Sequence, residues 1–172
     1  MIANQLVPKG GSTITNLFKS PPTGSQVFKF HPATGGYVFL QFVDGAWEGD
    51  DRAMSLHPGE GVFFSTPHPY THTFVGEILA NSAVPLIQGY SVISSALPIS
   101  GSLPELNFPA ENADQVYQYN CATGRYIFNS YFDGFWEGDM GGAAPVAQIG
   151  ESFFFSNPGR FRTWTRFFTV GP

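Results

Sequence analysis

Two acidic loops are the part of this sequence best suited, by residue type and spacing, to chemistry. Each loop has an Asp-Gly pair followed by a Trp-Glu-Gly-Asp tetrad, and the carboxylates are Asp44, Glu48, Asp50, Asp133, Glu137 and Asp139. Closely spaced carboxylates offer the oxygen ligands that calcium prefers, although this spacing differs from the twelve-residue loop of helix-loop-helix calcium sites. The alternative is that the aspartates hold turns and the other acids are solvated. Calcium is therefore an expectation for these six residues, and no other cofactor is indicated.

The same acids also have to be considered as a catalytic pair. Glu48 and Asp50 resemble the two carboxylates that glycoside hydrolases place on opposite sides of a bond. The pair is repeated as Glu137 and Asp139, however, and a small chain seldom needs two copies of one catalytic site. Repetition is more simply explained by folding, so we predict that the protein is not an enzyme.

The tryptophans of the two tetrads and the histidines have competing interpretations. Trp47 and Trp136 would stack on sugar rings if exposed, but a tryptophan at the end of a hairpin more often plugs a small barrel, and we favour the plug. The four histidines lack the cysteines or the helix that would fix a zinc site, so we expect them to be polar surface residues. They are His31, His57, His68 and His72.

A basic stripe is the feature of the second half that has no equivalent in the first. Alternation along a predicted strand over 161–170 places four residues on one side, namely Arg160, Arg162, Trp164 and Arg166. Guanidinium groups beside an indole suit a sulfated or carboxylated glycan. They equally suit the acidic loop at Asp50 and Asp51 of a second copy, which would give head-to-tail association. A third possibility is an exposed edge strand kept soluble by its charge.

An internal repeat determines which elements carry these residues. Residues 26–50 recur 89 positions later as 115–139, and Gly59-Glu60 recurs 91 positions later as Gly150-Glu151. Self-similarity over so long a period indicates duplicated structural units. We predict a first unit over 1–79, a linker over 80–88 and a second unit over 89–172.

The composition favours β-structure in both units. Aromatic residues make up 16% of the 172 residues and charged residues only 12%, with 20 glycines and 14 prolines, which is typical of short strands joined by tight turns. We predict an all-β fold of two small β-barrels or β-sandwiches, each with a short helical turn, within 9–20 and 101–108. The net charge of −5 argues against nucleic acid as a partner, and no apolar run is long enough to span a membrane.

Individual strands follow from alternation. A hairpin is predicted from 26–31 and 37–43, with further strands at 61–66 and 71–79. One face of each hairpin is aromatic, and we predict that this face is buried; its residues are Phe28, Phe30, Tyr37 and Phe39, and then Tyr117, Tyr119, Tyr126 and Phe128.

The opening strand of the first unit is shorter than that of the second. Ile2 and Leu6 occupy the places of Ile93 and Leu97, but the residues that precede Ile93 have no equivalent before Met1. We therefore expect the first unit to be cut inside its opening strand. The exposed edge left there would pair with another segment or another chain.

The chain resembles a tandem β-repeat family of secreted and surface proteins of environmental bacteria. The resemblance spans nearly the whole chain and lies in residues 1–6, 58–64 and 73–77 of the first copy and in residues 89–92, 114–117, 150–154 and 163–166 of the second. It implies export, with a signal segment and another strand ahead of Met1, and an extracellular or cell-surface location. The family has no established activity, so no functional residue is implied.

These observations together predict a non-catalytic, extracellular structural or adhesive protein. We expect it to assemble with itself, as a filament or a surface layer, through edge strands and charge contacts. The alternative is a glycan-binding module that uses exposed tryptophans and the Arg/Trp stripe, with an acidic glycan as the partner.

Overall fold

The computed structural model describes residues 1–169, and almost all of its regular structure is strand. The predicted last strand ends at Val170, which lies outside the described residues. The elements are α1 (Ile14–Leu17), β1 (Gln26–His31), β2 (Gly36–Val43), β3 (Ala46–Gly49), β4 (Phe63–Ser65), β5 (Asn81–Leu86), β6 (Gly89–Ile93), β7 (Gly101–Ser102), β8 (Gln115–Asn120), β9 (Arg125–Phe132), β10 (Phe135–Gly138), β11 (Val146–Ala147), β12 (Phe153–Asn157) and β13 (Arg162–Phe167).

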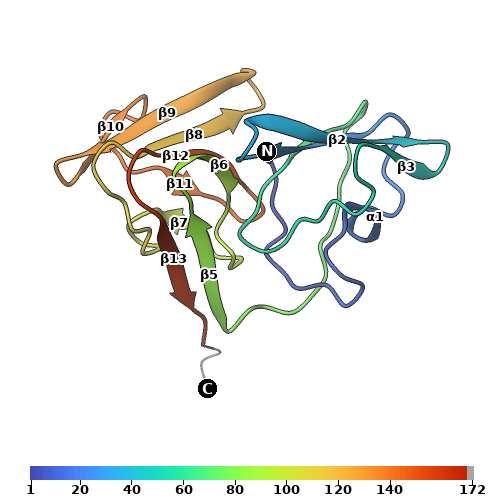
Figure 1. Cartoon of the computed structure of the whole chain (residues 1–172), viewed down its shortest axis with the longest axis horizontal. Helices are drawn as coiled ribbons and strands as arrows, with labels where there is room; N and C mark the ends of the chain where they lie inside the picture. The colour runs from blue at the N-terminus through green and yellow to red at the C-terminus, as the bar shows by residue number, and fades with distance from the viewer. Residues whose placement is uncertain (170–172) are drawn as a thin grey trace.

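The strands of residues 1–169 form antiparallel sheets, which confirms the all-β prediction. None of these sheets closes into the barrel that was one of the two predicted forms. The first sheet has the order β3-β2-β1-β4, and the second has the order β10-β9-β8-β12-β6. Figure 1 shows β1 and β2 beside β8 and β9, so that the two hairpins form one layer along one side of the molecule. None of the described helices is long and apolar enough to cross a membrane.

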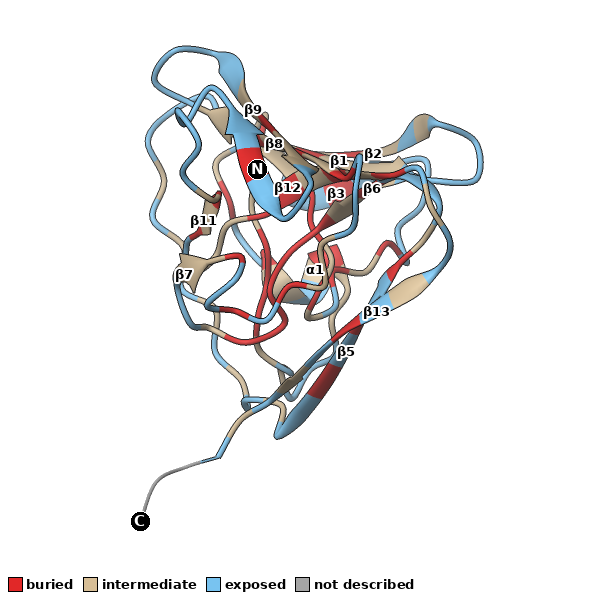
Figure 2. Cartoon of the chain, turned by 90° about the vertical axis from the view of Figure 1, so that its left-hand side faces the viewer, coloured by how far each residue is buried: buried red, intermediate tan, exposed pale blue. Residues whose placement is uncertain are grey.

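Each sheet packs one face on its own cluster of buried side chains. The first cluster includes Phe18, Leu40 and Trp47, and the second includes Phe153 and Trp164. Figure 2 shows the buried segments lying beneath the layer of paired hairpins. Burial of these side chains is the main stabilising contribution, because the charged residues are few.

The segment between the halves is more structured than predicted. The expected linker over 80–88 contains β5, which pairs antiparallel with β13 and sets Val84 opposite Trp164. Figure 1 shows these two strands as a separate ribbon below the hairpin layer. Residues 80–88 are thus part of the second core, since Val84 and Leu86 are buried there.

Two local predictions for the first half fare differently. The helical turn forms as α1, where the Thr13 hydroxyl caps the helix by accepting a hydrogen bond from the Asn16 N–H. The strand predicted over 71–79 is wrong, because only Glu77 makes a β-bridge, to Val7. Its counterpart β13 is a strand because β5 lies beside it, and β5 has no counterpart in the described first half. The helical turn predicted within 101–108 forms as a single turn after the start of β7, where the Leu106 N–H donates to the Ser102 carbonyl at 2.9 Å.

The two halves meet through reciprocal backbone contacts. The N–H of Ala3 donates to the carbonyl of Gly150 at 2.8 Å, and the N–H of Ser94 donates to the carbonyl of Gly59 at 2.9 Å. These two bonds are equivalent by the repeat, because Ser94 lies 91 positions after Ala3 and Gly150 lies 91 positions after Gly59. The opening segment of each half is therefore attached to the other half, in the way that two subunits share an isologous interface.

Candidate functional site

The acidic loops are built into the hairpins as structural elements. A carboxylate oxygen of Asp50 accepts a hydrogen bond from the Phe39 N–H at 3.0 Å, and Asp139 accepts one from the Phe128 N–H at 2.9 Å. Asp44 and Asp133 have positive φ values of 49° and 47°, as turn residues do. Within residues 1–169 no group of three acidic, histidine or cysteine side chains lies close enough together to hold a metal ion, and calcium binding by Glu48 and Glu137 stays a prediction.

The glycine of each tetrad explains why the motif is repeated. Gly49 and Gly138 have φ values of 140° and 142°, and a Cβ built on either would lie 2.3 Å from a carbonyl oxygen of the adjacent strand. Only glycine allows the backbone to approach so closely. The close approach of the glycines and the hydrogen bonds of Asp50 and Asp139 show that these residues, which both halves share, stabilise the fold of each hairpin.

The tryptophans are buried in the cores of open sheets, so the expected burial of Trp47 and Trp136 is confirmed but the barrel that they were expected to plug is not formed. Each is 5% exposed, and the Trp47 indole N–H donates to the Phe18 carbonyl at 2.8 Å. Trp164 is 1% exposed and donates to the Leu106 carbonyl at 2.9 Å. Since all three indoles face the cores, the exposed tryptophans expected for a glycan-binding module are wrong.

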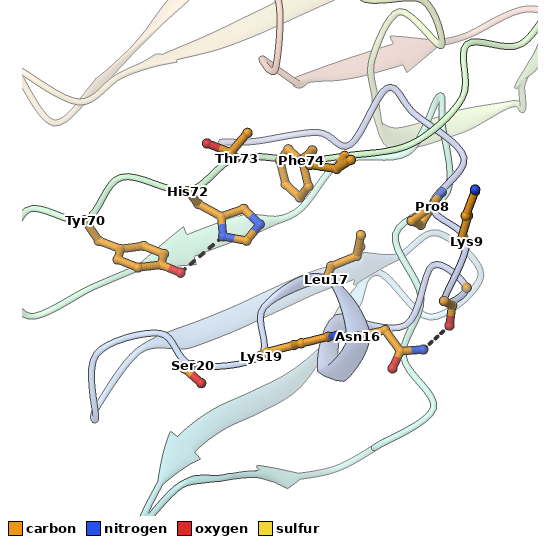
Figure 3. A pocket seen from close by; sticks show the side chains of 13 residues that line it. Pro8, Lys9, Asn16, Leu17, Lys19, Ser20, Tyr70, His72, Thr73 and Phe74 are labelled. Carbon is orange, nitrogen blue, oxygen red and sulfur yellow. Dashed lines mark hydrogen bonds between the residues drawn. The ribbon is translucent and has the colours of Figure 1, made fainter.

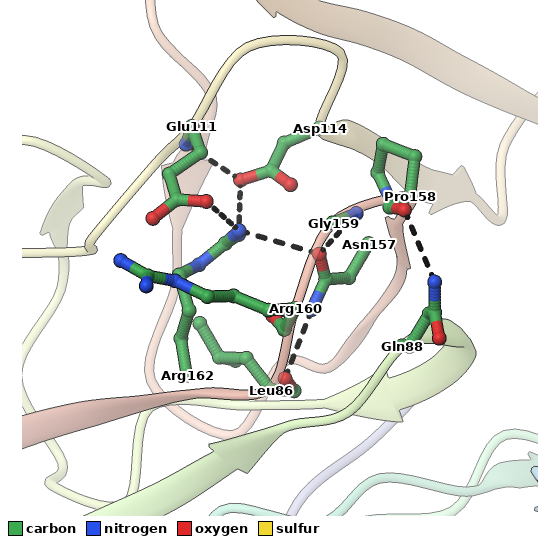
Figure 4. Close-up of polar contacts among 9 residues, drawn as sticks. All are labelled: Leu86, Gln88, Glu111, Asp114, Asn157, Pro158, Gly159, Arg160 and Arg162. Carbon is green, nitrogen blue, oxygen red and sulfur yellow. Dashed lines mark hydrogen bonds and ion pairs between the residues drawn. The ribbon is translucent and has the colours of Figure 1, made fainter.

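The basic stripe also points inward, which corrects the prediction of an exposed binding surface. Figure 4 shows Arg162 reaching Glu111 and Asp114, at nitrogen–oxygen distances of 2.8 and 2.5 Å. The Arg162 side chain is 8% exposed and that of Asp114 is fully buried. Arg166 is half-buried and donates to the Ser95 hydroxyl at 2.9 Å, so only Arg160 is exposed. Asp50 and Asp51 are exposed, and neither forms an ion pair with these arginines within the described chain.

Burial controls the ionisation of this pair. Removal from water raises the pKa of Asp114, although hydrogen bonds from Arg162 and from the Glu111 N–H, together with the positive charge of Arg162, act in the opposite direction. A second oxygen of Asp114 and the Nε of Arg162 are buried without a hydrogen-bond partner. The pair is therefore a structural ion pair whose members depend strongly on each other.

His72 is the histidine whose surroundings differ most from the prediction of a polar surface role. Figure 3 shows it in a groove of about 410 Å³ between α1 and the segment 70–75, with its Nδ1 3.1 Å from the Tyr70 hydroxyl. Its ring lies 4.5 Å from that of Phe18 and 4.8 Å from that of Phe74. Because burial disfavours the charged imidazolium, the pKa of His72 is lowered.

A pH dependence follows from His72. When the folded state holds a histidine at a lowered pKa, the unfolded chain takes up the proton first, so stability decreases as the pH falls below about 6.5. We expect the free energy of unfolding of the natural protein to decrease in this range, measured by urea denaturation at a series of pH values. The variant His72→Gln should lose this component of the slope, while His57→Gln, at an exposed site, should keep it. An unchanged slope in His72→Gln would contradict the assignment.

The aromatic faces of the two hairpins look outward, so the prediction that they are buried is wrong. On β1 and β2 the buried positions are Val27, Leu40 and Phe42 on the opposite face. The outward rings are half-buried or exposed, and they pack on one another; they are Phe28, Phe30, Tyr37, Phe39 and Phe63 in the first half and Tyr90, Tyr117, Tyr119, Tyr126, Phe128 and Phe154 in the second.

The outward rings continue across the junction of the halves. The ring of Phe30 lies 5.3 Å from Phe154, and that of Phe63 lies 6.2 Å from Tyr119. These two contacts are equivalent by the repeat, in the same reciprocal sense as the backbone contacts. An uninterrupted aromatic surface, which we call the aromatic face, thus covers both sheets. Sequence alternation finds its members but does not tell which side the cores occupy.

A second exposed feature is the open edge of the first sheet. β12 pairs with β8 on one side and β6 on the other, whereas its counterpart β4 pairs with β1 and ends the sheet. Beyond β4 only Ile2 bridges to Val62. The aromatic face and this edge are two exposed features of the described chain that could serve a partner.

No family model, no curated protein and no solved structure matches the chain.

Proposed function

We propose that the protein is a non-catalytic structural or adhesive protein of the cell exterior, made of two similar units, that assembles with copies of itself by strand addition. The observation that carries the proposal is the edge of β4. Among residues 1–169 the first sheet ends at this strand, where the second sheet continues with β6. An unpaired edge is a template for a strand from another chain.

The register supports the edge as a binding position. Ile2 pairs with Val62 as Ile93 pairs with Phe153, so the first half begins the same strand pairing as the second. In the second half the pairing continues with Tyr90 opposite Ser156. The equivalent position beside Ser65 carries no strand among residues 1–169. A strand added there would extend the sheet from four strands to five.

The donor strand is one that ends a sheet in the neighbouring copy. β3 and β10 are such strands, and a contact between β4 of one copy and β3 or β10 of the next joins two different surfaces. Contacts of this kind do not close on themselves unless the rotation happens to complete a ring, so they generate filaments. Charge contacts contribute through Arg160 and the loop at Asp50 and Asp51, all of which are exposed.

A single substitution tests the edge. Ser65→Lys places a charge on the exposed end of β4, and we expect it to reduce the assembly of the purified chain by at least roughly tenfold in the concentration required, as seen by light scattering and electron microscopy. The matched control is Ser156→Lys at the equivalent position of β12, which has neighbours on both sides and no edge to block. It should assemble like the natural chain.

Two results would contradict the proposal. One is a chain that stays monomeric at millimolar concentration, and the other is assembly that Ser65→Lys leaves unchanged. The location rests on the family resemblance, and fractionation of cells with an antibody to the protein tests it separately. Recovery in the cell interior alone would exclude a role outside the cell.

A further inference from the structure

The aromatic face of the second half contains a shallow, open cavity. It has a volume of about 340 Å³ and is lined by Tyr90, Tyr117, Tyr126 and Phe154. The Tyr117 and Tyr126 rings are perpendicular with centroids 6.5 Å apart, and Tyr90 lies 6.5 Å from Tyr117. Tyr90 is 50% exposed and Tyr126 is 42% exposed, so a ligand can reach ring surfaces on two sides. Exposed aromatic rings around a shallow hollow offer a stacking surface to a flat ligand.

The cavity depends on β6, a strand without a counterpart in the first sheet as far as residues 1–169 show. Three of its rings have counterparts in the first half, since Tyr117, Tyr126 and Phe154 correspond to Phe28, Tyr37 and Phe63. The fourth, Tyr90, is on β6, which the first sheet lacks. The second half therefore presents a four-sided aromatic site, and the repeat alone does not require it.

The strands around the cavity carry polar side chains, and by alternation they place no basic side chain on this face. Gln115 lies on the same face as Tyr117, between Ser130 on one side and Ser156 on the other. The Tyr117 hydroxyl donates to the amide oxygen of Gln115 at 2.8 Å. By alternation, β6, β8, β9 and β12 place no charged side chain on this face, and β10 adds one acid, Glu137, opposite Ser130. Amide and hydroxyl groups both donate and accept hydrogen bonds, so this row suits a ligand with many hydroxyl groups.

The phenols themselves stay neutral. Burial is the main cause that raises the pKa of both Tyr117 and Tyr126, and the neighbouring tyrosines act in the same direction. These hydroxyls thus remain hydrogen-bond donors well above physiological pH.

We propose that this cavity binds a sugar ring of a neutral polysaccharide. A pyranose ring has C–H groups on its faces and hydroxyl groups at its edge, which match a floor and wall of rings with Gln115 and two serines beside them. An acidic glycan would need cations, and this face offers none. A proline-rich peptide also docks on tyrosines, but it presents mainly carbonyl acceptors and would leave the acceptors of this row unused.

The ligand is longer than one sugar. Tyr37 is 46% exposed, and it is close enough to Tyr126 to act on the ionisation of its phenol. From the cavity the aromatic face continues past Phe63 and Tyr119 into the first half. A chain of several sugar units can therefore stack on successive rings, and its affinity should rise with chain length.

Calorimetry with defined oligosaccharides tests the proposal. Cellohexaose, mannohexaose and maltohexaose serve as neutral probes, and a sulfated heparin hexasaccharide serves as the charged one. We expect at least one neutral hexasaccharide to bind, its trisaccharide to bind more weakly, and the charged one to show no binding. Tyr126→Ala and Tyr90→Ala should each weaken binding by roughly tenfold. Phe161→Ala, which removes an exposed ring of similar size beside β13, should leave it unchanged.

The controls separate this proposal from self-assembly. Circular dichroism should show that each tyrosine variant keeps the natural fold, as expected for exposed side chains. Ser65→Lys, which blocks the β4 edge, should still bind the oligosaccharide, so the two proposals fail independently. The proposal is overturned if none of the three neutral probes binds, if binding survives in the Tyr90→Ala, Tyr126→Ala double variant, or if a proline-rich peptide binds at these residues and the sugars do not.

Discussion

Arg162→Met should lower the free energy of unfolding by about 3–5 kcal/mol, the usual loss when one member of a buried ion pair is removed. The substitution leaves the fully buried carboxylate of Asp114 without its cation, and it also removes the contact of the guanidinium with Asn157. Methionine retains much of the volume of the arginine stem, so the loss comes mainly from the uncompensated charge. Urea denaturation followed by tryptophan fluorescence measures it, because all three indoles are buried.

Two further variants identify the cause. Glu111 is the other partner of Arg162, and the Glu111 side chain is 45% exposed. Glu111→Gln should therefore change the free energy of unfolding by no more than about 1 kcal/mol. Adding Asp114→Asn to Arg162→Met removes the orphaned charge and should recover part of the lost stability. If the double variant is less stable than Arg162→Met alone, the buried charge is not the cause of the loss.

The pH dependence of Arg162→Met has a definite sign. Loss of the arginine removes the hydrogen bond and the charge that lower the pKa of Asp114, so burial raises this pKa further in the variant. A carboxyl group whose pKa is higher in the folded than in the unfolded chain is least favourable to folding above its folded-state pKa. The destabilisation by Arg162→Met should therefore be largest at neutral pH and should decrease in acid, as Asp114 takes up a proton.

Arg162 also illustrates what the sequence leaves undetermined. Alternation correctly places Arg162 and Trp164 on one side of a strand, but it does not tell that this side faces a core. The buried partner, Asp114, is 48 residues away. One signal was available. Asp114 stands where the first copy has Ser25, so a buried acid and a matching arginine both occur only in the second half.

The prediction that the aromatic face is buried is wrong for a related reason. Both sides of β1 and β2 are apolar, because Val27, Leu40 and Phe42 alternate with the aromatic rings. Ring size favours the aromatic side as the core, yet α1 and the covering loops pack on the other side. Which side is covered depends on the path of chain segments distant in sequence, and periodicity carries no information about it.

Features that depend on local sequence were predicted with greater success. The hairpin over 26–31 and 37–43 matches β1 and β2 to within one residue, since turn chemistry and alternation act over short distances. The Asp and Gly of the repeated tetrad make the same structural contacts in both halves, as expected for residues that serve the folding of each hairpin. The strand predicted over 71–79 does not form, because a strand requires a neighbouring strand. In the second half the counterpart β13 has this neighbour in β5, which is the segment that the sequence suggested as a linker.

Gly138→Ala is expected to lower the free energy of unfolding by about 3–5 kcal/mol, from backbone strain and overpacking combined. The added Cβ would lie 2.3 Å from the carbonyl oxygen of Phe128 and 2.9 Å from the Cα of Asn129, and neither is a side chain that can move aside. Gly134→Ala is the matched control, in the turn of the same hairpin. Its φ is 89° but nothing lies within 4 Å of the added Cβ, so it should lose only about 1–2 kcal/mol. Equal losses in the two variants would show that the close approach is not responsible.

The equivalent substitution in the first half, Gly49→Ala, shows whether the halves unfold together. We expect a comparable loss, because its Cβ would also lie 2.3 Å from a backbone carbonyl oxygen. We further expect a single unfolding transition in both variants, measured by calorimetry, since Ala3 bonds to Gly150 and Ser94 bonds to Gly59 across the junction. Disruption of either hairpin then removes support from the other half. Two separate transitions, with only one displaced by each substitution, would mean instead that each half folds alone and that the reciprocal contacts add little to stability.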